Sequence, residues 1–481
     1  MKKQLMLING KWAESSNDEW LEVVNPATEE VFAKVPVATP EDVKKAVCAA
    51  QDAFFPWAKL SPAQRADYLY RAGEIILQKS AEIARTLTTE QGKPLKEAEG
   101  EVKGSAKVMR YFAEEVQRIY GDIIPATEAK IKSFVIHQPV GVVAAITPWN
   151  YPVQLLAWKV GAALSAGCTV VAKPSSETPL SPLEFLGCFI DAKIPAGVVN
   201  GLVGPGKVVG DALIKHPAVR KVAFTGSTEA GKKVMSACSG NFKKVSLELG
   251  GQCPLIVFSD CDFERAIKGA VRRSFRNMGQ VCNAVNRIYV EEKIYGKFIE
   301  KFAQETGKLV IDNGLKNPSA DLGPMVSQDA LDKVIEHIDD ALKKGARIVC
   351  GGEKLEGEKF KKGFFYKPTI VVDVNHSMLI MQEETFGPAV GVMSFKDLAE
   401  AIKLANDTQY GLAAYLYTNN VHIIHKVCEE LECGSVGVNN VDVATINVPY
   451  GGWKESGVGQ ELGRQGLEEY MQIKHIKLEF F

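Results

Sequence analysis

Cys282 has the sequence surroundings of a catalytic nucleophile. It follows residues 277–281, Asn-Met-Gly-Gln-Val, whose glycine and amide side chains indicate irregular backbone with hydrogen-bond donors near the sulfur. Most of the ten cysteines are expected to be small, buried and inert, and an apolar helix face would not have this composition. A thiolate in such a setting can attack a carbonyl carbon and form a covalent intermediate.

Two further polar residues stand at the ends of predicted strands. Glu248 precedes a glycine pair, where partial burial would raise its pKa and suit a general base, although a structural cap or an ion-pair partner is the more common role. Asn150 follows the strand expected over 141–147, and its amide could donate to a developing oxyanion, although asparagine before Tyr-Pro is also a common turn residue.

Two glycine-rich stretches could hold phosphate. Residues 226–233, GSTEAGKK, follow a predicted strand and open a helix, so they offer N–H groups to a dinucleotide pyrophosphate or form only a tight turn. Lys233 replaces the hydroxyl that binds Mg²⁺ in a P-loop, which argues against a nucleoside triphosphatase. Gly206 and Gly210 lie in a second stretch that is one residue too long for G-x-G-x-x-G.

The elements that must position these residues read as an α/β protein. Residues 41–118 have helical periodicity, and from 141 onward short apolar strands alternate with helices, which predicts a parallel sheet covered on both faces. A second αβ series extends from 262 to 445. Residues 472–481 alternate like a strand that adds to another sheet, a neighbouring subunit's being one candidate.

Composition excludes several classes of protein. The chain has 481 residues, 46% hydrophobic and 24% charged, with a formal net charge of −1, which is globular usage and argues against nucleic-acid or membrane-surface binding. Ten cysteines are too sparse for a disulfide scaffold, and no apolar run approaches the roughly 20 residues of a membrane-spanning helix. We expect a cytoplasmic protein. The seven histidines form no convincing ligand set, so no metal site is expected.

Together, these residues resemble the aldehyde dehydrogenase superfamily over essentially the whole chain. The motifs in order are PWN at 148–150, KPS at 173–175, FTGS at 224–227, ELGG at 248–251, GQVC at 279–282, ETFGP at 384–388 and PYGGWKESG at 449–457. The resemblance implies an α/β fold with three parts. They are a Rossmann-type cofactor domain over 1–118 and 139–250, an α/β catalytic domain over 251–449, and a small β oligomerisation extension from 119–138 and 466–481. A homodimer or homotetramer is the implied assembly.

The resemblance also implies a mechanism. Cys282 attacks the aldehyde, the Asn150 amide and the Cys282 N–H hold the oxyanion, hydride passes to a nicotinamide, and Glu248 activates the water that hydrolyses the thioester. Glu248 argues against a CoA-acylating relative. A non-catalytic paralogue would be expected to lack one of these three residues.

For the cofactor, the resemblance places Lys173 and Glu384 at the riboses, Ser227 near the pyrophosphate and Phe386 against the nicotinamide ribose. Ser176 stands where NAD-preferring members have a glutamate, so NADP is favoured over NAD, although a slip that brings in Glu177 would restore NAD preference. The other expected cofactor-binding residues are Thr147, Pro148, Trp149, Ser175, Gly206, Gly210, Phe224, Gly226 and Leu249.

For the substrate, the resemblance is greatest to NAD(P)-dependent succinate-semialdehyde dehydrogenases. Arg276 lies six residues before Cys282 (282 − 276 = 6), where those enzymes bind the distal carboxylate with arginine, although here it could be a solvated helix residue. Three positions differ from those enzymes. Trp158 stands in place of their second carboxylate-binding arginine, Ala444 in place of a serine, and Ala284 in place of the second cysteine that many of them have. Residues expected to line an aromatic tunnel are Tyr151, Trp158 and Tyr450.

An anionic aldehyde is therefore expected, with succinate semialdehyde as the first candidate. Glutarate or 2-oxoglutarate semialdehyde and a sulfonated aldehyde are alternatives, followed by lactaldehyde. An aminoaldehyde would suit the aromatic tunnel, because aromatic faces hold ammonium groups, but Arg276 would repel it.

Overall fold

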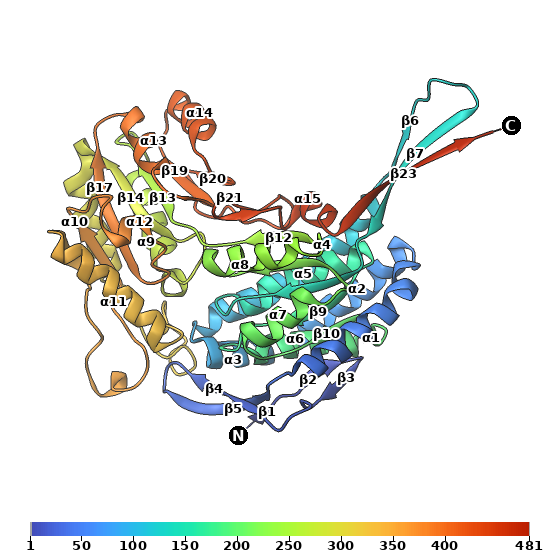
Figure 1. Cartoon of the computed structure of the whole chain (residues 1–481). Helices are drawn as coiled ribbons and strands as arrows, with labels where there is room; N and C mark the ends of the chain where they lie inside the picture. The colour runs from blue at the N-terminus through green and yellow to red at the C-terminus, as the bar shows by residue number, and fades with distance from the viewer. Residues whose placement is uncertain (1, 481) are drawn as a thin grey trace.

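Two large sheets form the framework of the computed structural model, which describes residues 2–480. Figure 1 shows them in separate halves of the molecule, with a narrow sheet extending away at the upper right. The eight strands of the first sheet, in spatial order, are β22 (Gly457–Val458), β12 (Lys244–Glu248), β11 (Val219–Thr225), β8 (Val142–Ile146), β9 (Thr169–Lys173), β10 (Val199–Gly201), β2 (Met6–Ile8) and β3 (Lys11–Ala13).

Strands β12, β11, β8, β9 and β10 are parallel, as the alternation of strands and helices predicts. Both faces of this sheet are buried, because alternate residues of a strand point to opposite sides. Val142 and Ala144 of β8 pack in one apolar cluster, and Val143 and Ala145 pack in the other. The first cluster includes α1 (Pro40–Ala58), α7 (Asp211–Lys215) and α8 (Thr228–Ser239).

The helices on the other face are α2 (Pro62–Gln78), α3 (Ser80–Gln91), α4 (Leu95–Glu115), α5 (Pro152–Ala166) and α6 (Leu180–Asp191). Thr39 and Ser61 begin α1 and α2 with capping boxes, each followed by proline in the first turn. Helix α5 is buried almost all round, which explains why Lys159 is its only charged residue.

The second large sheet has seven strands and is parallel except for β15. In spatial order they are β15 (Arg347–Cys350), β16 (Thr369–Val372), β17 (Ala389–Phe395), β14 (Val285–Glu291), β13 (Cys253–Val257), β19 (Ala413–Tyr417) and β20 (Ser435–Val438). Its helices are α9 (Phe263–Phe275), α10 (Tyr295–Thr306), α11 (Gln328–Lys343), α12 (Leu379–Gln382), α13 (Leu398–Asn406) and α14 (Val421–Glu430).

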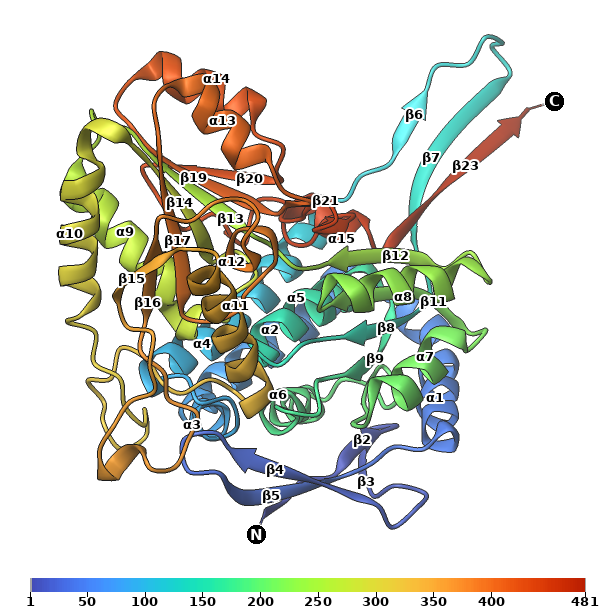
Figure 2. The ribbon, with the colours of Figure 1, turned by 60° about the vertical axis from the view of Figure 1, so that its left-hand side comes forward.

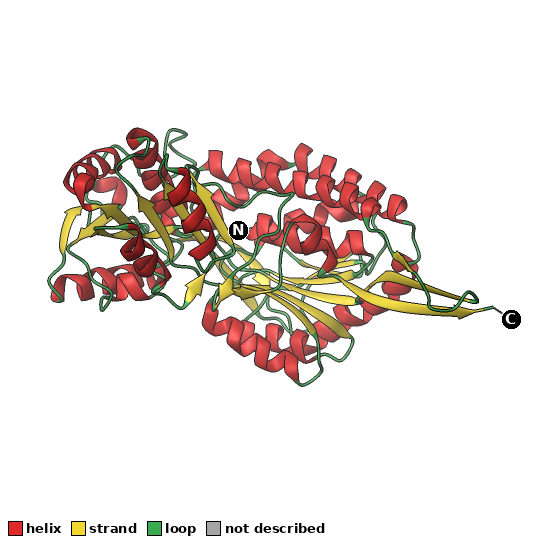
Figure 3. Ribbon diagram, turned by 90° about the horizontal axis from the view of Figure 1, so that it is seen from above, coloured by secondary structure: helices red, strands yellow, loops and turns green. Residues whose placement is uncertain are grey.

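The narrow sheet consists of β6 (Asp122–Ile124), β7 (Ile131–Pro139) and β23 (Met471–Glu479). The C-terminal strand β23 pairs antiparallel with β7 of the same chain along its whole length, from Met471 opposite Pro139 to Glu479 opposite Ile131. Seen from above, these strands extend well beyond the helices (Figure 3). Several large apolar side chains on them are exposed, including Ile123 and Ile473, each 72% exposed.

The N-terminal strands lie together at the lower edge of the molecule in both side views (Figures 1 and 2). Strands β1 (Lys2–Lys3), β5 (Glu30–Pro36) and β4 (Trp20–Asn25) form a three-stranded sheet. The remaining elements are the pair β18 (Tyr410–Gly411) and β21 (Trp453–Lys454), and α15 (Gly463–Glu468). Within residues 2–480, no helix is both long and apolar enough to cross a membrane.

Candidate active site

A cavity of about 250 Å³ opens beside the carboxyl ends of β11 and β12. The predicted residues that line it are Pro148, Trp149, Asn150, Gly226, Ser227, Glu248, Leu249, Cys282, Glu384 and Phe386. They come from both halves of the molecule, and the structure brings the nucleophile, base and amide candidates to one space. The remaining predicted residues do not line this cavity: Thr147, Tyr151, Trp158, Lys173, Ser175, Ser176, Gly206, Gly210, Phe224, Arg276 and Tyr450.

The backbone before Cys282 is held in an unusual conformation. Asn277 and Met278 have φ of 50° and 58°, and Gly279 follows at 68°, so three successive residues are left-handed. A Cβ at position 279 would collide with the carbonyl oxygen of Gly387, which explains the glycine. The Gln280 side chain secures the turn, since its Nε2 donates to Asn277 O at 3.0 Å and its Oε1 accepts from a backbone N–H at 3.0 Å.

Glu248 is the last residue of β12 and is 2% exposed. Burial raises the pKa of its carboxyl to about 8, and the neighbouring Cys282 thiol opposes part of that rise. Neither carboxylate oxygen has a hydrogen-bond partner at standard geometry among residues 2–480. A buried carboxylate with vacant acceptors can take a proton from water or from a thiol.

The surroundings of Cys282 favour its protonated thiol. Burial raises its pKa well above the usual value, the Glu248 carboxylate raises it further, and the Tyr450 hydroxyl, 3.8 Å from the sulfur, opposes the shift. Attack on a carbonyl requires the thiol to lose its proton, and the Glu248 carboxyl is an ionisable neighbour of the sulfur.

Asn150 is fixed from two directions. Its Nδ2 donates to Gln280 O at 3.0 Å, which ties its side chain to the turn before the nucleophile. Its own carbonyl oxygen accepts from Lys93 Nζ at 2.7 Å and from Asn277 Nδ2 at 3.2 Å. One N–H of the Asn150 amide is thus engaged, and the other remains available to an oxyanion beside Cys282.

The cofactor candidates fit a dinucleotide. Strand β11 ends at Thr225, and Ser227 caps α8 by accepting from Ala230 N at 3.3 Å, so the first N–H groups of α8 face the cavity region where an anion would bind. Thr147 Oγ1 is buried without a partner in the described chain, as expected of a group that meets a ligand. Glu384 accepts from Gly251 N at 3.0 Å, and burial raises its pKa to about 7.

The residues predicted at the adenosine end of the cofactor carry charges of both signs. Lys173 is buried, burial lowers its pKa to about 8, and its Nζ donates to Pro174 O at 3.2 Å. Ser176 donates to Gly204 O at 3.2 Å. Glu177 accepts from Ser175 and raises the pKa of Lys173. Its carboxylate therefore lies near Lys173, where the spacing of the motif alone would place only Ser176. A Cβ at Gly206 or Gly210 would meet nothing within 4 Å, so neither glycine is sterically required.

The substrate candidates form two groups. Trp158 and Tyr450 are buried and make an edge-to-face pair with centroids 5.6 Å apart, next to the sulfur through Tyr450. Arg276 is 36% exposed and ends α9; its Nε donates to Glu97 at 2.8 Å, and its guanidinium lies 5.6 Å from the Tyr151 ring centroid. Tyr151 also donates to Glu97, at 2.6 Å. Arg276 therefore has a fixed ion-pair partner, and its side chain is partly exposed.

Residues 12–476 match the model of the Aldehyde dehydrogenase family. The chain belongs to this family. It is 45% identical to an NADP(+) succinate-semialdehyde dehydrogenase of Escherichia coli (strain K12), over 98% of this chain and 97% of that protein. It is 43% identical to a 3-sulfolactaldehyde dehydrogenase of Pseudomonas putida, over 99% and 97%. A crystal structure of an NADP-dependent enzyme from E. coli superposes with a TM-score of 0.97 at 44% identity, covering 100% and 98%.

The family and the α/β fold predicted from the motifs are thereby confirmed, and the protein is an aldehyde dehydrogenase oxidoreductase. Several residues at the site of this aldehyde dehydrogenase were not predicted. Lys333 of α11 lines the cavity and donates to Glu384 O at 2.5 Å. Glu97 accepts a hydrogen bond from Arg276. Lys93, which is paired with Glu101, donates to the carbonyl oxygen of Asn150. Of these four residues, only Lys93 had a local sequence signal, the Gly-Lys-Pro turn at 92–94.

Proposed function

We propose that this aldehyde dehydrogenase oxidises an aldehyde with a distal anionic group to the carboxylic acid, with NADP or NAD as hydride acceptor. The observation that carries the substrate class is Arg276, a guanidinium ordered by Glu97 beside the ring that follows Asn150. The names of two relatives support it, because succinate semialdehyde carries a carboxylate and sulfolactaldehyde a sulfonate. A guanidinium suits both groups.

The geometry supports the following roles. Glu248 takes the thiol proton, and Cys282 attacks the aldehyde carbon to form a thiohemiacetal. The Asn150 amide and the Cys282 N–H stabilise the oxyanion, which then collapses to a thioester as hydride leaves. A nicotinamide dinucleotide, which Ser227, Glu384 and Phe386 would hold, would supply the hydride acceptor. Glu248 passes the thiol proton to solvent and then removes a proton from the water that attacks the thioester, and the acid departs as the Cys282 sulfur leaves the carbonyl carbon as a thiolate.

Succinate semialdehyde is the first substrate we propose, followed by glutarate or 2-oxoglutarate semialdehyde and a sulfonated aldehyde. These share a negative group at the end of a short chain. Lactaldehyde has no anion for Arg276, and an aminoaldehyde would bring a cation toward it, so both rank lower.

Arg276→Ala should raise KM for succinate semialdehyde at least about tenfold, because a lost charge-assisted hydrogen bond costs about 1.5–3 kcal/mol. KM for a neutral aldehyde of the same length should change much less. Steady-state kinetics with both aldehydes makes the measurement. Arg272→Ala is the matched control: Arg272 lies one turn earlier on α9 and pairs with exposed Asp442 at 2.8 Å, so its loss should leave both KM values unchanged. Equal effects of Arg276→Ala on the two aldehydes would contradict the proposal.

We further propose that NADP is preferred. Ser176 leaves room for a 2′-phosphate, and Lys173 adds a positive charge, while Glu177 opposes binding from its contact with Ser175. Ser176→Glu should shift the NADP-to-NAD ratio of kcat/KM at least about tenfold toward NAD, since a like-charge contact costs at least 1.4 kcal/mol at close range. Kinetics with both cofactors gives the ratio. A ratio far below one in the unmodified enzyme, or one that Ser176→Glu leaves unchanged, would contradict the preference.

We also propose the interleaved partition predicted above: cofactor domain 1–118 and 139–250, catalytic domain 251–449, and oligomerisation strands 119–138 and 466–481. The exposed apolar side chains of β6 and β23 support a homodimer or homotetramer that covers them.

A further inference from the structure

A buried ion pair lies behind the proposed oxyanion donor. Lys93 and Glu101 have fully buried side chains, and Lys93 Nζ lies 2.6 Å from Glu101 Oε2. Lys93 follows Gly92, which ends α3 with φ of 95°, and Glu101 lies on the second turn of α4. A buried pair is costly unless further hydrogen bonds satisfy both ions. Those further contacts all go to one short segment, residues 150–154.

The lysine holds the start of that segment. Its Nζ donates to Asn150 O at 2.7 Å and lies 3.6 Å from the Tyr151 ring centroid. The ammonium group therefore has a carboxylate, a carbonyl oxygen and an aromatic face as its three partners. The carbonyl belongs to the residue whose side-chain amide would bind the oxyanion.

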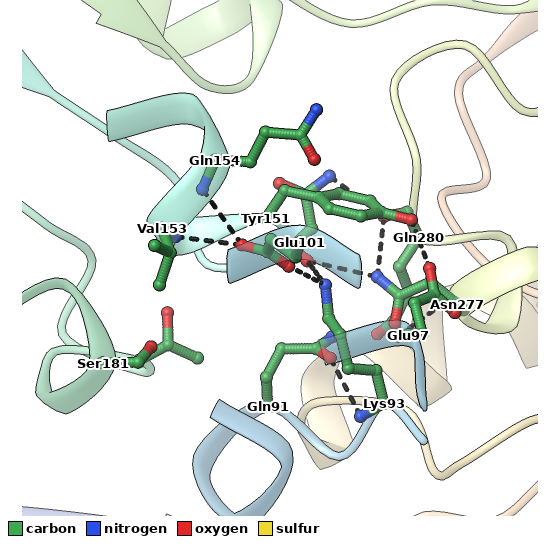
Figure 4. Close-up of polar contacts among 12 residues, drawn as sticks. Gln91, Lys93, Glu97, Glu101, Tyr151, Val153, Gln154, Ser181, Asn277 and Gln280 are labelled. Atoms are coloured by element: carbon green, nitrogen blue, oxygen red, sulfur yellow. Dashed lines mark hydrogen bonds and ion pairs between the residues drawn. The ribbon is translucent and has the colours of Figure 1, made fainter. Parts of the chain in front are cut away.

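The glutamate holds the end of the segment. Figure 4 shows Glu101 between Lys93 and the backbone of Val153 and Gln154, whose N–H groups donate to Oε1 at 3.0 and 3.1 Å. Helix α5 begins here, and its N-cap residue, Tyr151, makes no side-chain cap. Glu101 thus supplies the cap from another helix and places negative charge at the positive end of α5.

We propose that Lys93 and Glu101 are positioning residues for the reaction: together they fix the backbone on both sides of the Asn150 side chain so that its amide meets the oxyanion at Cys282. The inference rests on the proposed role of Asn150. A misplacement of about 1 Å in a reacting geometry can cost about 10²-fold in rate. The pair does not line the cavity, so its effect should pass through residues 150–154, of which only Asn150 lines the cavity.

The test replaces both charges at once, in Lys93→Met with Glu101→Gln. A single replacement would leave an unpaired buried ion, whereas the double change keeps volume and an acceptor for the N–H groups of α5. We expect kcat to fall about 10- to 100-fold while KM for the aldehyde changes less than about threefold. Thermal melting checks that the variant is folded, and Lys93→Gln combined with Glu101→Gln, which keeps a donor to Asn150 O, should show a smaller loss in the same direction. An unchanged kcat would overturn the inference.

A double-mutant cycle with Asn150→Ala separates positioning from a general loss of packing. Asn150→Ala alone should lower kcat about 10²-fold, the usual effect of one lost oxyanion donor. Adding the pair replacement should lower it further by less than about threefold, because the residue through which the pair acts is already gone. A full additional loss would overturn the inference. Retention of kcat by Asn150→Ala alone would overturn the proposed role of Asn150, and with it the inference, before the pair is tested.

Lys243→Met is the matched control. Lys243 is also a buried lysine that holds backbone carbonyls, His216 O at 2.8 Å and Val219 O at 2.6 Å, but it lies at the opposite end of β11 from the cavity. Its replacement should lower the melting temperature and leave kcat unchanged. A loss of kcat equal to that of the Lys93–Glu101 replacement would show that any buried lysine has this effect and would overturn the inference.

Discussion

Cys282→Ala should lower kcat by at least about 10⁴-fold, because the covalent route disappears and only substrate binding remains. The substitution removes one sulfur that faces the cavity and lies 3.8 Å from the Tyr450 hydroxyl, so the fold should survive. Absorbance of the reduced cofactor under steady-state conditions measures the loss. Cofactor affinity, measured by fluorescence titration, should change less than about threefold because the residues that would hold the cofactor are untouched.

Cys48→Ala provides the control for this prediction. Cys48 is exposed on α1, remote from the cavity lining, and its replacement should leave kcat unchanged. Full activity in Cys282→Ala would overturn the nucleophile assignment. Loss of activity in both variants would point to a general sensitivity of the enzyme to cysteine replacement.

The residues at strand ends could be predicted from the sequence because their local surroundings carry the signal. Glu248 precedes two glycines, and Ser227 follows one at the start of a helix, so the chain must turn there and leave polar groups exposed to a ligand. The structure places both in the cavity lining. The local sequence alone was sufficient to predict that these two residues lie at a ligand site.

Residues that act through tertiary contacts could not be predicted in this way. In sequence, Lys93, Glu97 and Glu101 read as ordinary charges around the start of a helix, and helical spacing alone predicts solvated side chains. Their burial depends on α5 packing against α4, which no local pattern reports. The pairing of β2 with β10, about 190 residues later in the chain, could not be predicted for a related reason.

The three arginines at the end of α9, at positions 272, 273 and 276, also show that a sequence pattern does not predict tertiary contacts. The sequence suggests a single basic face, but the structure separates them. Arg272 pairs with Asp442 at the surface, Arg273 is buried against Asn283 O and Tyr415, and Arg276 pairs with Glu97. Each guanidinium has a different partner, and of the three only Arg276 lies over the Tyr151 ring. In the sequence, Arg276 is distinguished by its position relative to Cys282 and not by composition.

Replacement of Glu248 is the second change with a large expected effect on kcat. Glu248→Gln should lower kcat about 10³-fold, because thioester hydrolysis loses its base. Acylation should be less affected than hydrolysis: the variant loses one acceptor for the thiol proton, but the Glu248 carboxylate also raises the pKa of Cys282, so its removal makes the thiolate easier to form by loss of the proton to solvent. The acyl-enzyme should therefore accumulate. Rapid mixing should show a burst of about one reduced cofactor per active site followed by slow turnover, and intact-protein mass spectrometry should show the acyl group on the enzyme.

Glu90→Gln is the matched control for this variant. Glu90 is also a buried glutamate, and burial raises its pKa to about 8 as well, but it accepts from Leu180 N and Ser181 N, away from the cavity lining. Its replacement should change stability without producing a burst. A burst of the same size in Glu90→Gln, or none in Glu248→Gln, would contradict the assignment of Glu248 as the hydrolytic base.

The pH profile provides a separate test of the same carboxyl. A pKa of about 8 means that Glu248 is protonated below that pH and becomes a base as pH rises through it. The rate of hydrolysis should therefore increase about tenfold per pH unit below 8 and level off above it. Glu248→Gln should remove this dependence from kcat, because glutamine does not titrate. Persistence of the same profile in Glu248→Gln would assign the titration to another group, and the thioester would then require a different base.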